Sequence, residues 1–166
     1  MVQFLPFLAN TPIMRIRHLN QHIAYTEIVI QPQFHDLDPL NIVWHGNYVR
    51  YLETARCELL CQIGYDYPQM KASGFAWPVV DMRIKYIRPA RYGMTLVVSC
   101  AVIEWEHRLK IHYELRERET GQIINRAYTI QVAVDMRTEE MCYQSPAILE
   151  QCLKPYLQGI QSCSNV

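Results

Sequence analysis

The sequence predicts an α+β fold in which one long helix packs against an antiparallel sheet. Two observations support this prediction. A single amphipathic helical pattern runs over residues 49–63, and the segments after it alternate apolar and polar residues with the period of a strand. A parallel sheet needs strands and helices that alternate repeatedly, and this chain lacks that alternation. With 166 residues, half of them apolar, the chain is long enough for one domain with a sizeable core.

The first predicted strand covers residues 22–34, where β-branched residues are frequent. It leads directly into the segment Phe34-His-Asp-Leu-Asp-Pro-Leu-Asn-Ile-Val-Trp-His-Gly-Asn-Tyr48. Asp38-Pro39 favours a turn, because proline fixes its own φ and keeps the residue before it out of the α region. Asn41 is a residue type that tolerates a positive φ. We therefore expect a bent, exposed loop that brings two carboxylates to the start of a helix.

The predicted helix follows this loop and ends at Gly64, which is placed at the C′ position. Asn47 is the favoured N-cap and Gly46 is the alternative. One side of the helix is apolar, and its residues are Tyr48, Leu52, Ala55, Leu59 and Ile63. The N–H groups of the first turn have no acceptor inside the helix and bear a partial charge of roughly +0.5. A polarised or anionic oxygen would be held there.

The remaining elements follow from alternation and from turn residues. Residues 65–75 contain proline, glycine and serine without a clear period, which predicts a surface loop able to act as a flap. Strands are predicted over residues 80–86, 95–106, 109–116 and 124–136, with a hairpin turn at Thr120-Gly121. One face of the last strand is predicted to hold Ile124, Tyr128, Ile130, Val132, Val134 and Met136. Ser145-Pro146 predicts the start of a short amphipathic helix.

The charges and the cysteines exclude several classes of protein. Sixteen basic and sixteen acidic residues leave no net field that would gather nucleic acid or an anionic membrane. The six cysteines include no C-x-x-C pair, so we expect a reducing, cytoplasmic setting. Cys57 and Cys61 have no second pair of ligands to match them, and structural thiols are expected there instead of a metal site. The N-terminal apolar run has no basic residue before it and is interrupted by proline, so neither a signal peptide nor a membrane span is expected.

Two segments together resemble a known family. The first is Phe34-x-Asp36-x-Asp38-Pro39-x-x-Ile42-Val43-Trp44-His45-x-Asn47-Tyr48, followed by Tyr51-Leu52-Glu53-x-Ala55-Arg56. The second runs from Val79-Val80 to Arg88-Pro89-x-Arg91-Tyr92-Gly93. They resemble the hotdog-fold acyl-CoA thioesterases of the 4-hydroxybenzoyl-CoA thioesterase type and their Tol-Pal-associated relatives. Asn41 departs from the family pattern, where many members have glycine, and so does Met94, where many have aspartate.

The resemblance implies a fold, an assembly and a catalytic residue. The fold would be a hotdog, with a long central helix wrapped by a curved antiparallel sheet of about five strands. The hotdog domain would span residues 22–144, between an N-terminal arm (1–21) and a C-terminal helix and tail (145–166). The assembly would be a homodimer or a homotetramer with active sites at the subunit interface. Asp38, the second aspartate of the motif, would be the catalytic carboxylate.

Thioester hydrolysis needs a carboxylate, donors for the carbonyl oxygen, and room for the acyl group. Asp38 would act as a general base, which works better if burial raises its pKa, or as a nucleophile that forms an anhydride opened by water. The helix start at Gly46 and Asn47 would aim backbone N–H groups at the developing oxyanion, and Gly46 would leave this backbone uncovered.

The neighbours of these residues have simpler predicted roles. His45 would polarise the carbonyl or bind water, or else only pack against Trp44. Trp44 and Tyr48 are predicted walls of the pocket. Asp36 is assigned to stabilising the loop, and Glu53 to an ion pair with an arginine three residues away on the helix.

The predicted function is hydrolysis of an acyl-CoA or acyl-carrier-protein thioester, without a metal or a cofactor other than the coenzyme A of the substrate. Arg88, Arg91 and Arg108 are candidates for binding its phosphates, although solvated strand ends explain them equally well. The chain has no P-loop and no Gly-x-Ser-x-Gly elbow, which disfavours nucleotide-dependent chemistry and an α/β-hydrolase. The alternatives are a hotdog hydratase or dehydratase, and a protein that binds acyl thioesters without turnover.

Overall fold

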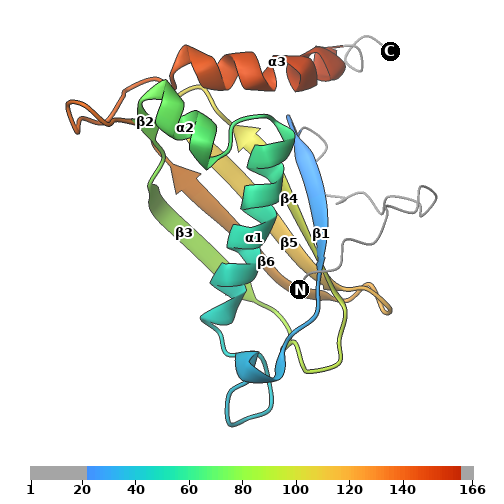
Figure 1. The fold of residues 1–166 in the computed structure, drawn as a ribbon. Coiled ribbons are helices and arrows are strands. Elements are labelled where there is room, and N and C mark those ends of the chain that lie inside the picture. Colours follow the sequence, from blue (N-terminus) through green and yellow to red (C-terminus); the bar gives the residue numbers. More distant parts are fainter. Residues whose placement is uncertain (1–21, 162–166) are drawn as a thin grey trace.

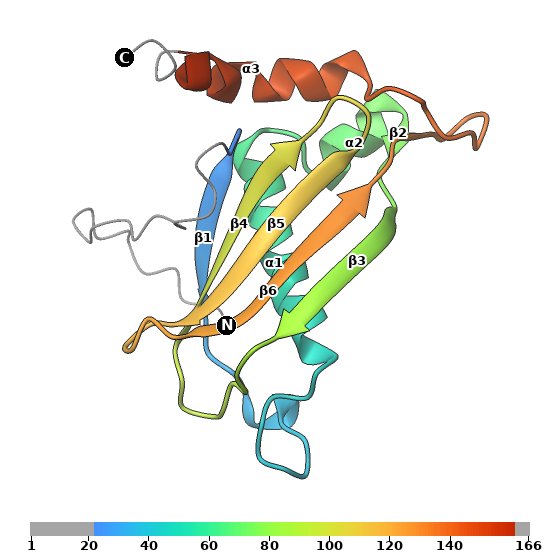
Figure 2. The same ribbon diagram turned by 180° about the vertical axis from the view of Figure 1, so that it is seen from behind.

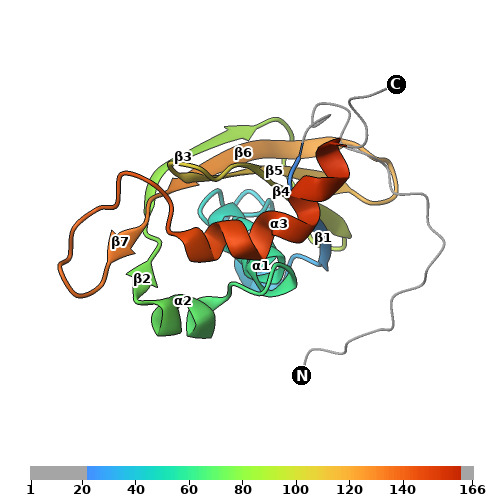
Figure 3. The same cartoon turned by 90° about the horizontal axis from the view of Figure 1, so that it is seen from above.

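A curved antiparallel sheet around one long helix forms the body of the computed structural model, which describes residues 22–161. The sheet has five strands in the order β1-β4-β5-β6-β3. Their bounds are β1 (Tyr25–Ile30), β3 (Val79–Tyr86), β4 (Leu96–Glu104), β5 (Leu109–Glu117) and β6 (Ile123–Gln131). Helix α1 (Asn47–Gln62) lies along the concave face of this sheet (Figure 1 and Figure 3). The predicted hotdog arrangement is confirmed, whereas the predicted N-terminal arm (1–21) lies outside the described residues.

Smaller elements flank this body. A 3-10 turn, η1 (Phe34–Asp36), begins the loop before α1, and a two-stranded sheet pairs β2 (Phe75–Ala76) with β7 (Val134–Asp135). Helix α3 (Ala147–Gln161) crosses one end of the sheet (Figure 2) and is longer than the short C-terminal helix that the sequence predicts. No helix within residues 22–161 combines the length and the apolar character that a membrane crossing requires.

The core lies between α1 and the inner face of the central strands. Leu52, Ala55 and Leu59 of α1 are almost completely buried, as the helical pattern predicts. They face the alternate residues of β4 and β5, which are buried to the same extent: Leu96, Val98, Cys100 and Val102 in β4, and Leu109, Ile111 and Leu115 in β5. Fully burying one leucine contributes about 1.5–3 kcal/mol, so this layer holds α1 against the sheet.

The predicted C-terminal end of α1 is confirmed, and the predicted N-cap residue is wrong. Gly64 adopts a φ of +73° directly after the C-cap residue, as expected for the C′ position. At the other end the N-cap is Gly46, and the preference for Asn47 was wrong. The amide of Asn47 donates instead to the main-chain oxygen of Asp36 at 2.9 Å, so it holds the loop and does not cap its own helix.

Most of the segment 65–75 forms a helix, and the prediction of a loop was wrong there. Helix α2 (Tyr67–Ser73) begins after Asp66, whose side chain accepts a hydrogen bond from the N–H of Tyr67, and Pro68 lies in the first turn. Gly74 ends the helix with a φ of +80°. The proline and the glycine that suggested a loop are therefore the start and the end of a short helix.

The inner face of β6 also differs from the prediction. Its register with β5 places Asn125, Ala127, Thr129 and Gln131 opposite the core residues of β5, and all four are buried. Tyr128 and Ile130 lie on the outer face, where they pair with His112 and Lys110. The predicted strand also ends early, because the chain leaves the large sheet after Gln131 and joins β2 through β7.

Candidate active site

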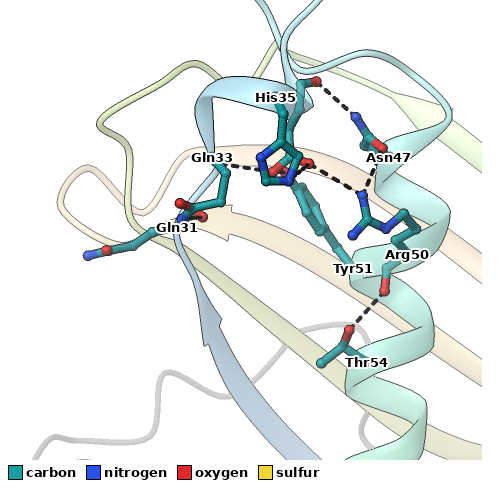
Figure 4. A network of polar contacts seen from close by, with 8 residues as sticks. Gln31, Gln33, His35, Asn47, Arg50, Tyr51 and Thr54 are labelled. Atoms are coloured by element: carbon teal, nitrogen blue, oxygen red, sulfur yellow. Dashed lines mark hydrogen bonds and ion pairs between the residues drawn. The ribbon is translucent and has the colours of Figure 1, made fainter. Parts of the chain in front are cut away.

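The loop between β1 and α1 is folded around the side chain of Asp36, which is only 3% exposed. Its Oδ2 accepts hydrogen bonds from the N–H of Gln33 and from the hydroxyl of Tyr51, both at 2.8 Å. Its main-chain oxygen accepts from the N–H of Trp44 and from the amide of Asn47, both at 2.9 Å. Figure 4 shows Gln33, Asn47 and Tyr51 converging on this part of the loop. The predicted role of Asp36 in stabilising the loop is visible in these four bonds.

Asp38 forms a tight turn of its own. The N–H of Asp38 donates to the main-chain oxygen of Ile42 at 2.8 Å, and Asn41 adopts a φ of +57°, the conformation that the sequence predicts it to tolerate. Oδ1 of Asp38 accepts from the N–H groups of Leu40 and Ile42, at 2.8 and 3.4 Å. Oδ2 of Asp38 has no hydrogen-bond partner among the described residues. One oxygen of the carboxylate therefore holds the turn, and the other is available to a ligand.

A second segment, distant in sequence, closes against this loop. The N–H of Val43 donates to the main-chain oxygen of Ala90 at 2.9 Å. The hydroxyl of Tyr86 donates to the main-chain oxygen of His45 at 3.0 Å, and the N–H of Ala90 donates to the hydroxyl of Tyr48 at 2.9 Å. These contacts fix the turn after β3 beside the start of α1.

A cavity of about 310 Å³ lies between the two segments. This volume is at the small end of the range for ligand pockets. Its wall combines one carboxylate, one histidine, one arginine and two tyrosines with apolar side chains: Asp38, Ile42, Val43, His45, Tyr48, Tyr86, Ile87, Arg88 and Pro89. The described part of the chain contains no group of three side chains able to hold a metal ion.

The start of α1 provides hydrogen-bond donors beside the cavity. Within residues 22–161, no acceptor is bonded to the main-chain N–H groups of His45, Gly46 and Tyr48. The main-chain N–H of Asn47 donates to the main-chain oxygen of Trp44. Such free N–H groups at a helix N-terminus are favourable positions for an anion or a polarised carbonyl.

Gly46 lies beneath the indole of Trp44. A Cβ atom at this position would lie 2.1 Å from Cζ3 of Trp44, because the indole is folded over Gly46. The glycine therefore makes room for the indole, a role that was not predicted from the sequence. Trp44 itself is 49% exposed and packs against the ring of His45, with 4.9 Å between centroids. It does not line the cavity.

The three arginines are not brought together within one chain. Arg88 lines the cavity, and Arg91 is exposed on the same turn. Arg108 belongs to the connection between β4 and β5, which lies at the opposite end of the sheet from the loop between β1 and α1 (Figure 1), and it pairs with Glu104 at 2.8 Å. Glu53 also has a structural partner, because it forms the predicted ion pair with Arg56.

Tyr86, Ile87 and Pro89 are wall residues that sequence reasoning missed. The only available signal was their position inside the second resembling segment. Assigning them to the cavity requires knowing that the turn after β3 packs against the start of α1, and alternation along one strand does not contain that information.

The two buried tyrosines of α1 are donors at neutral pH. Burial raises the pKa of the Tyr48 hydroxyl, and the nearby charge of Asp38 raises it further. Burial and the hydrogen bond to Asp36 raise the pKa of Tyr51. Both hydroxyls therefore keep their protons at neutral pH, where a carboxylate with an ordinary pKa is charged.

Comparison with known proteins identifies the family. The model of the thioesterase-like superfamily matches residues 32–152, which include the Asp38 loop, α1 and the turn after β3. A Synechocystis protein provisionally named esterase sll0410 is 32% identical over 128 residues, which cover 76% of this chain and 77% of that protein. The acyl-CoA thioester hydrolase YbgC of Escherichia coli O6:H1 is 24% identical over 106 residues, covering 64% of this chain and 79% of that protein. The structure of 4-hydroxybenzoyl-CoA thioesterase from Pseudomonas sp. has the same fold, with a TM-score of 0.68 at 22% identity over 78% of this chain and 99% of that one. This chain belongs to the thioesterase-like superfamily.

Proposed function

We propose that this protein hydrolyses acyl-CoA thioesters and that Asp38 is its catalytic carboxylate. The proposal rests on one observation: the half-buried Asp38 lines the same cavity as the first turn of α1, and its Oδ2 has no hydrogen-bond partner among residues 22–161. A carboxylate and free N–H groups on one cavity are what an acyl-transfer reaction requires. The names of the relatives described above point to the same chemistry.

In the general-base route, the oxygen of a water molecule attacks the carbonyl carbon while Oδ2 of Asp38 takes one of its protons. The negative charge then develops on the carbonyl oxygen, where N–H groups of the helix start would stabilise it by about 3–4 kcal/mol per donor. The carbon–sulfur bond breaks, and the proton passes to the sulfur, which leaves a free acid and a thiol. In the nucleophilic route, Oδ2 attacks the carbonyl carbon itself, the carbon–sulfur bond breaks and the thiolate leaves, so that the acyl group is held as an anhydride on Asp38. Water then opens the anhydride to the free acid and the Asp38 carboxylate, and the second proton of this water goes to the thiolate.

Substrate binding is proposed for the residues around the reacting atoms. Arg88 uses one N–H for the main-chain oxygen of Ile123, at 3.2 Å, and its other donors would bind a phosphate of coenzyme A together with Arg91. His45 lines the cavity with its ring against Trp44, and we assign it to the carbonyl or to a water. Arg108 would take part only from a second subunit, because within one chain it lies at the other end of the sheet.

A homo-oligomer is part of the proposal. Strand β3 is at the edge of the sheet, and within residues 22–161 no strand pairs with its free side. Val79, Val80 and Ile87 are exposed along this edge. An unpaired edge with apolar side chains favours pairing with another strand, and a second copy of β3 would cover it. A reducing, cytoplasmic setting is also proposed, since the five cysteines within the described residues are free thiols.

The decisive experiment compares the wild type with Asp38→Asn on a panel of short, long and aromatic acyl-CoAs, with a thiol reagent to detect released coenzyme A. We expect release by the wild type and a loss of about 10²–10⁴-fold in kcat for the variant, with substrate binding retained. Equal turnover would remove Asp38 from its role. Tight binding without release would indicate a binding protein, and hydration of an enoyl-CoA with the thioester intact would indicate a hydratase. A single turnover in ¹⁸O-labelled water that places the label in Asp38 would demonstrate the nucleophilic route, because the general-base route puts the label only into the product acid.

A further inference from the structure

The hydroxyl of Tyr48 accepts a hydrogen bond but does not donate one within the described residues. It accepts a hydrogen bond from the N–H of Ala90 at 2.9 Å. A tyrosine hydroxyl can also donate one hydrogen bond. In the described part of the chain no acceptor takes this proton, although Asp38 lines the same cavity. Tyr48 therefore brings an uncommitted O–H group to the site.

The position of this hydroxyl is fixed before any ligand binds. Tyr48 is 3% exposed. The rings of Tyr51 and Tyr86 pack against it edge-on, with 6.0 and 5.5 Å between centroids. The bond from Ala90 holds the oxygen itself. A donor that is held in place needs no reorganisation when charge develops in front of it, which is the condition under which a hydrogen bond accelerates a reaction.

The hydroxyl also keeps its proton throughout. Burial and the charge of Asp38 both raise its pKa, so it does not act as an acid or a base near neutral pH. Its oxygen already accepts from Ala90, and its proton can be donated in a hydrogen bond to a ligand. The cavity wall offers three side chains that can accept a hydrogen bond, Asp38, His45 and Tyr86, and within the described residues none of them takes the proton of Tyr48. The remaining acceptor is the oxygen atom of a bound substrate.

We propose that Tyr48 is a catalytic residue whose O–H donates a hydrogen bond to the carbonyl oxygen of the thioester, beside the N–H groups of the helix start. The bond strengthens as that oxygen becomes an oxyanion, and no proton leaves Tyr48. The inference rests on the proposed thioesterase function and adds a side-chain donor to its backbone donors.

The test uses Tyr48→Phe and the acyl-CoA that the wild type hydrolyses fastest. We expect kcat to fall by about 10²-fold, with KM changed by less than about threefold, since the donor acts mainly in the transition state. The variant also leaves the N–H of Ala90 without an acceptor, so urea unfolding must show that it is folded under the assay conditions.

A vibrational measurement separates donation from a merely structural role. The carbonyl stretch of a ¹³C-labelled thioester is recorded while bound to Asp38→Asn and to Asp38→Asn/Tyr48→Phe. We expect a lower frequency than in water for the first, and a partial return toward the value in water for the second. The matched control is Asp38→Asn/Tyr51→Phe, because the proton of Tyr51 is already committed to Asp36. Its carbonyl frequency should stay closer to that of Asp38→Asn than to that of Asp38→Asn/Tyr48→Phe.

Each result has one meaning. A loss of kcat with an unchanged carbonyl frequency would show that Tyr48 only holds the turn at Ala90, and would overturn the inference. Wild-type kcat in Tyr48→Phe would also overturn it while leaving the proposed function intact. An absence of hydrolysis by the wild type would overturn the proposed function itself.

Discussion

Removing the side chain of Asp36 should damage this protein more than removing that of Asp38, although only Asp38 lines the cavity. A single oxygen of Asp36, Oδ2, accepts both the N–H of Gln33 and the hydroxyl of Tyr51. Asp36→Ala deletes both bonds. Asp36→Asn can keep both, because the amide oxygen can take the place of Oδ2. The amide nitrogen would then replace Oδ1, which lies 3.6 Å from Nη1 of Arg50.

The magnitude follows from burial. A hydrogen bond to a charged group contributes about 1.5–3 kcal/mol, and a buried donor left without a partner costs a similar amount. Tyr51 is buried, so its hydroxyl would incur the full cost, whereas Gln33 is exposed and water can replace the carboxylate. We expect Asp36→Ala to lower the free energy of unfolding by about 3 kcal/mol. Asp36→Asn should lower it by about 1 kcal/mol, since the contact with the exposed Arg50 is worth little.

The assay is urea unfolding of Asp36→Ala, Asp36→Asn, Tyr51→Phe and the double variant Asp36→Ala/Tyr51→Phe, with thioesterase activity measured in parallel. The double-mutant cycle should give a coupling of about 1–2 kcal/mol between Asp36 and Tyr51. Asp38→Asn is the control, and its unfolding free energy should stay within about 1 kcal/mol of the wild type. The reasoning fails if Asp36→Asn is as unstable as Asp36→Ala, because the charge and not the pair of bonds would then matter.

Three further predictions follow from single contacts. Asn125 is 0% exposed, and neither atom of its amide has a hydrogen-bond partner within the described residues. Asn125→Leu should therefore raise the free energy of unfolding by about 1–2 kcal/mol in urea titrations. A lower free energy of unfolding in the variant would show that the amide is hydrogen-bonded in solution. In Gly46→Ala the new Cβ would displace the indole of Trp44. We expect a red-shifted tryptophan emission and a free energy of unfolding that is lower by about 1 kcal/mol. An unchanged emission spectrum would contradict the packing of the indole on Gly46. The pKa of Cys61 is raised to about 11 by the hydrogen bond from its Sγ to Asp66, together with burial and the negative charge of Asp66. The Cys61 thiol should therefore react slowly with a disulfide reagent at pH 8. Its rate should increase in Asp66→Asn, and equal rates in the two proteins would refute this cause.

The main helix and the positions of most strands along the chain could be predicted from the sequence because both depend on local patterns. The apolar residues of α1 recur at helical spacing, and Gly64 marks its end. The clear alternation in residues 109–116 corresponds to β5, whose even and odd residues do face opposite sides. Such periods are set by backbone geometry alone and need no knowledge of the partner element.

The two wrong elements failed for opposite reasons. For α2 the local signals were present, since Asp66 is an N-cap, Pro68 lies in the first turn and Gly74 is a C-terminal glycine, but they were attributed to a loop. For β6 the local signal was misleading. Its inner face holds three polar residues (Asn125, Thr129 and Gln131), and only the register with β5 shows that this face meets the core.

Asp36 and Asp38, which are separated by one residue, have different surroundings in the structure. Asp36 and Asp38 are identical side chains two residues apart, and the sequence alone separates them only through a family resemblance. In the structure, η1 turns the first inward, where its side chain holds Gln33 and Tyr51 and its main-chain oxygen holds Trp44 and Asn47. The same residue therefore joins the beginning of the loop, its end and the helix, and so sets how far the Asp38 turn lies from the N–H groups of α1. A residue that does not line the cavity thus positions the carboxylate and the donors to which we assign catalysis, and we expect activity to be as sensitive to Asp36 as to the groups in the cavity.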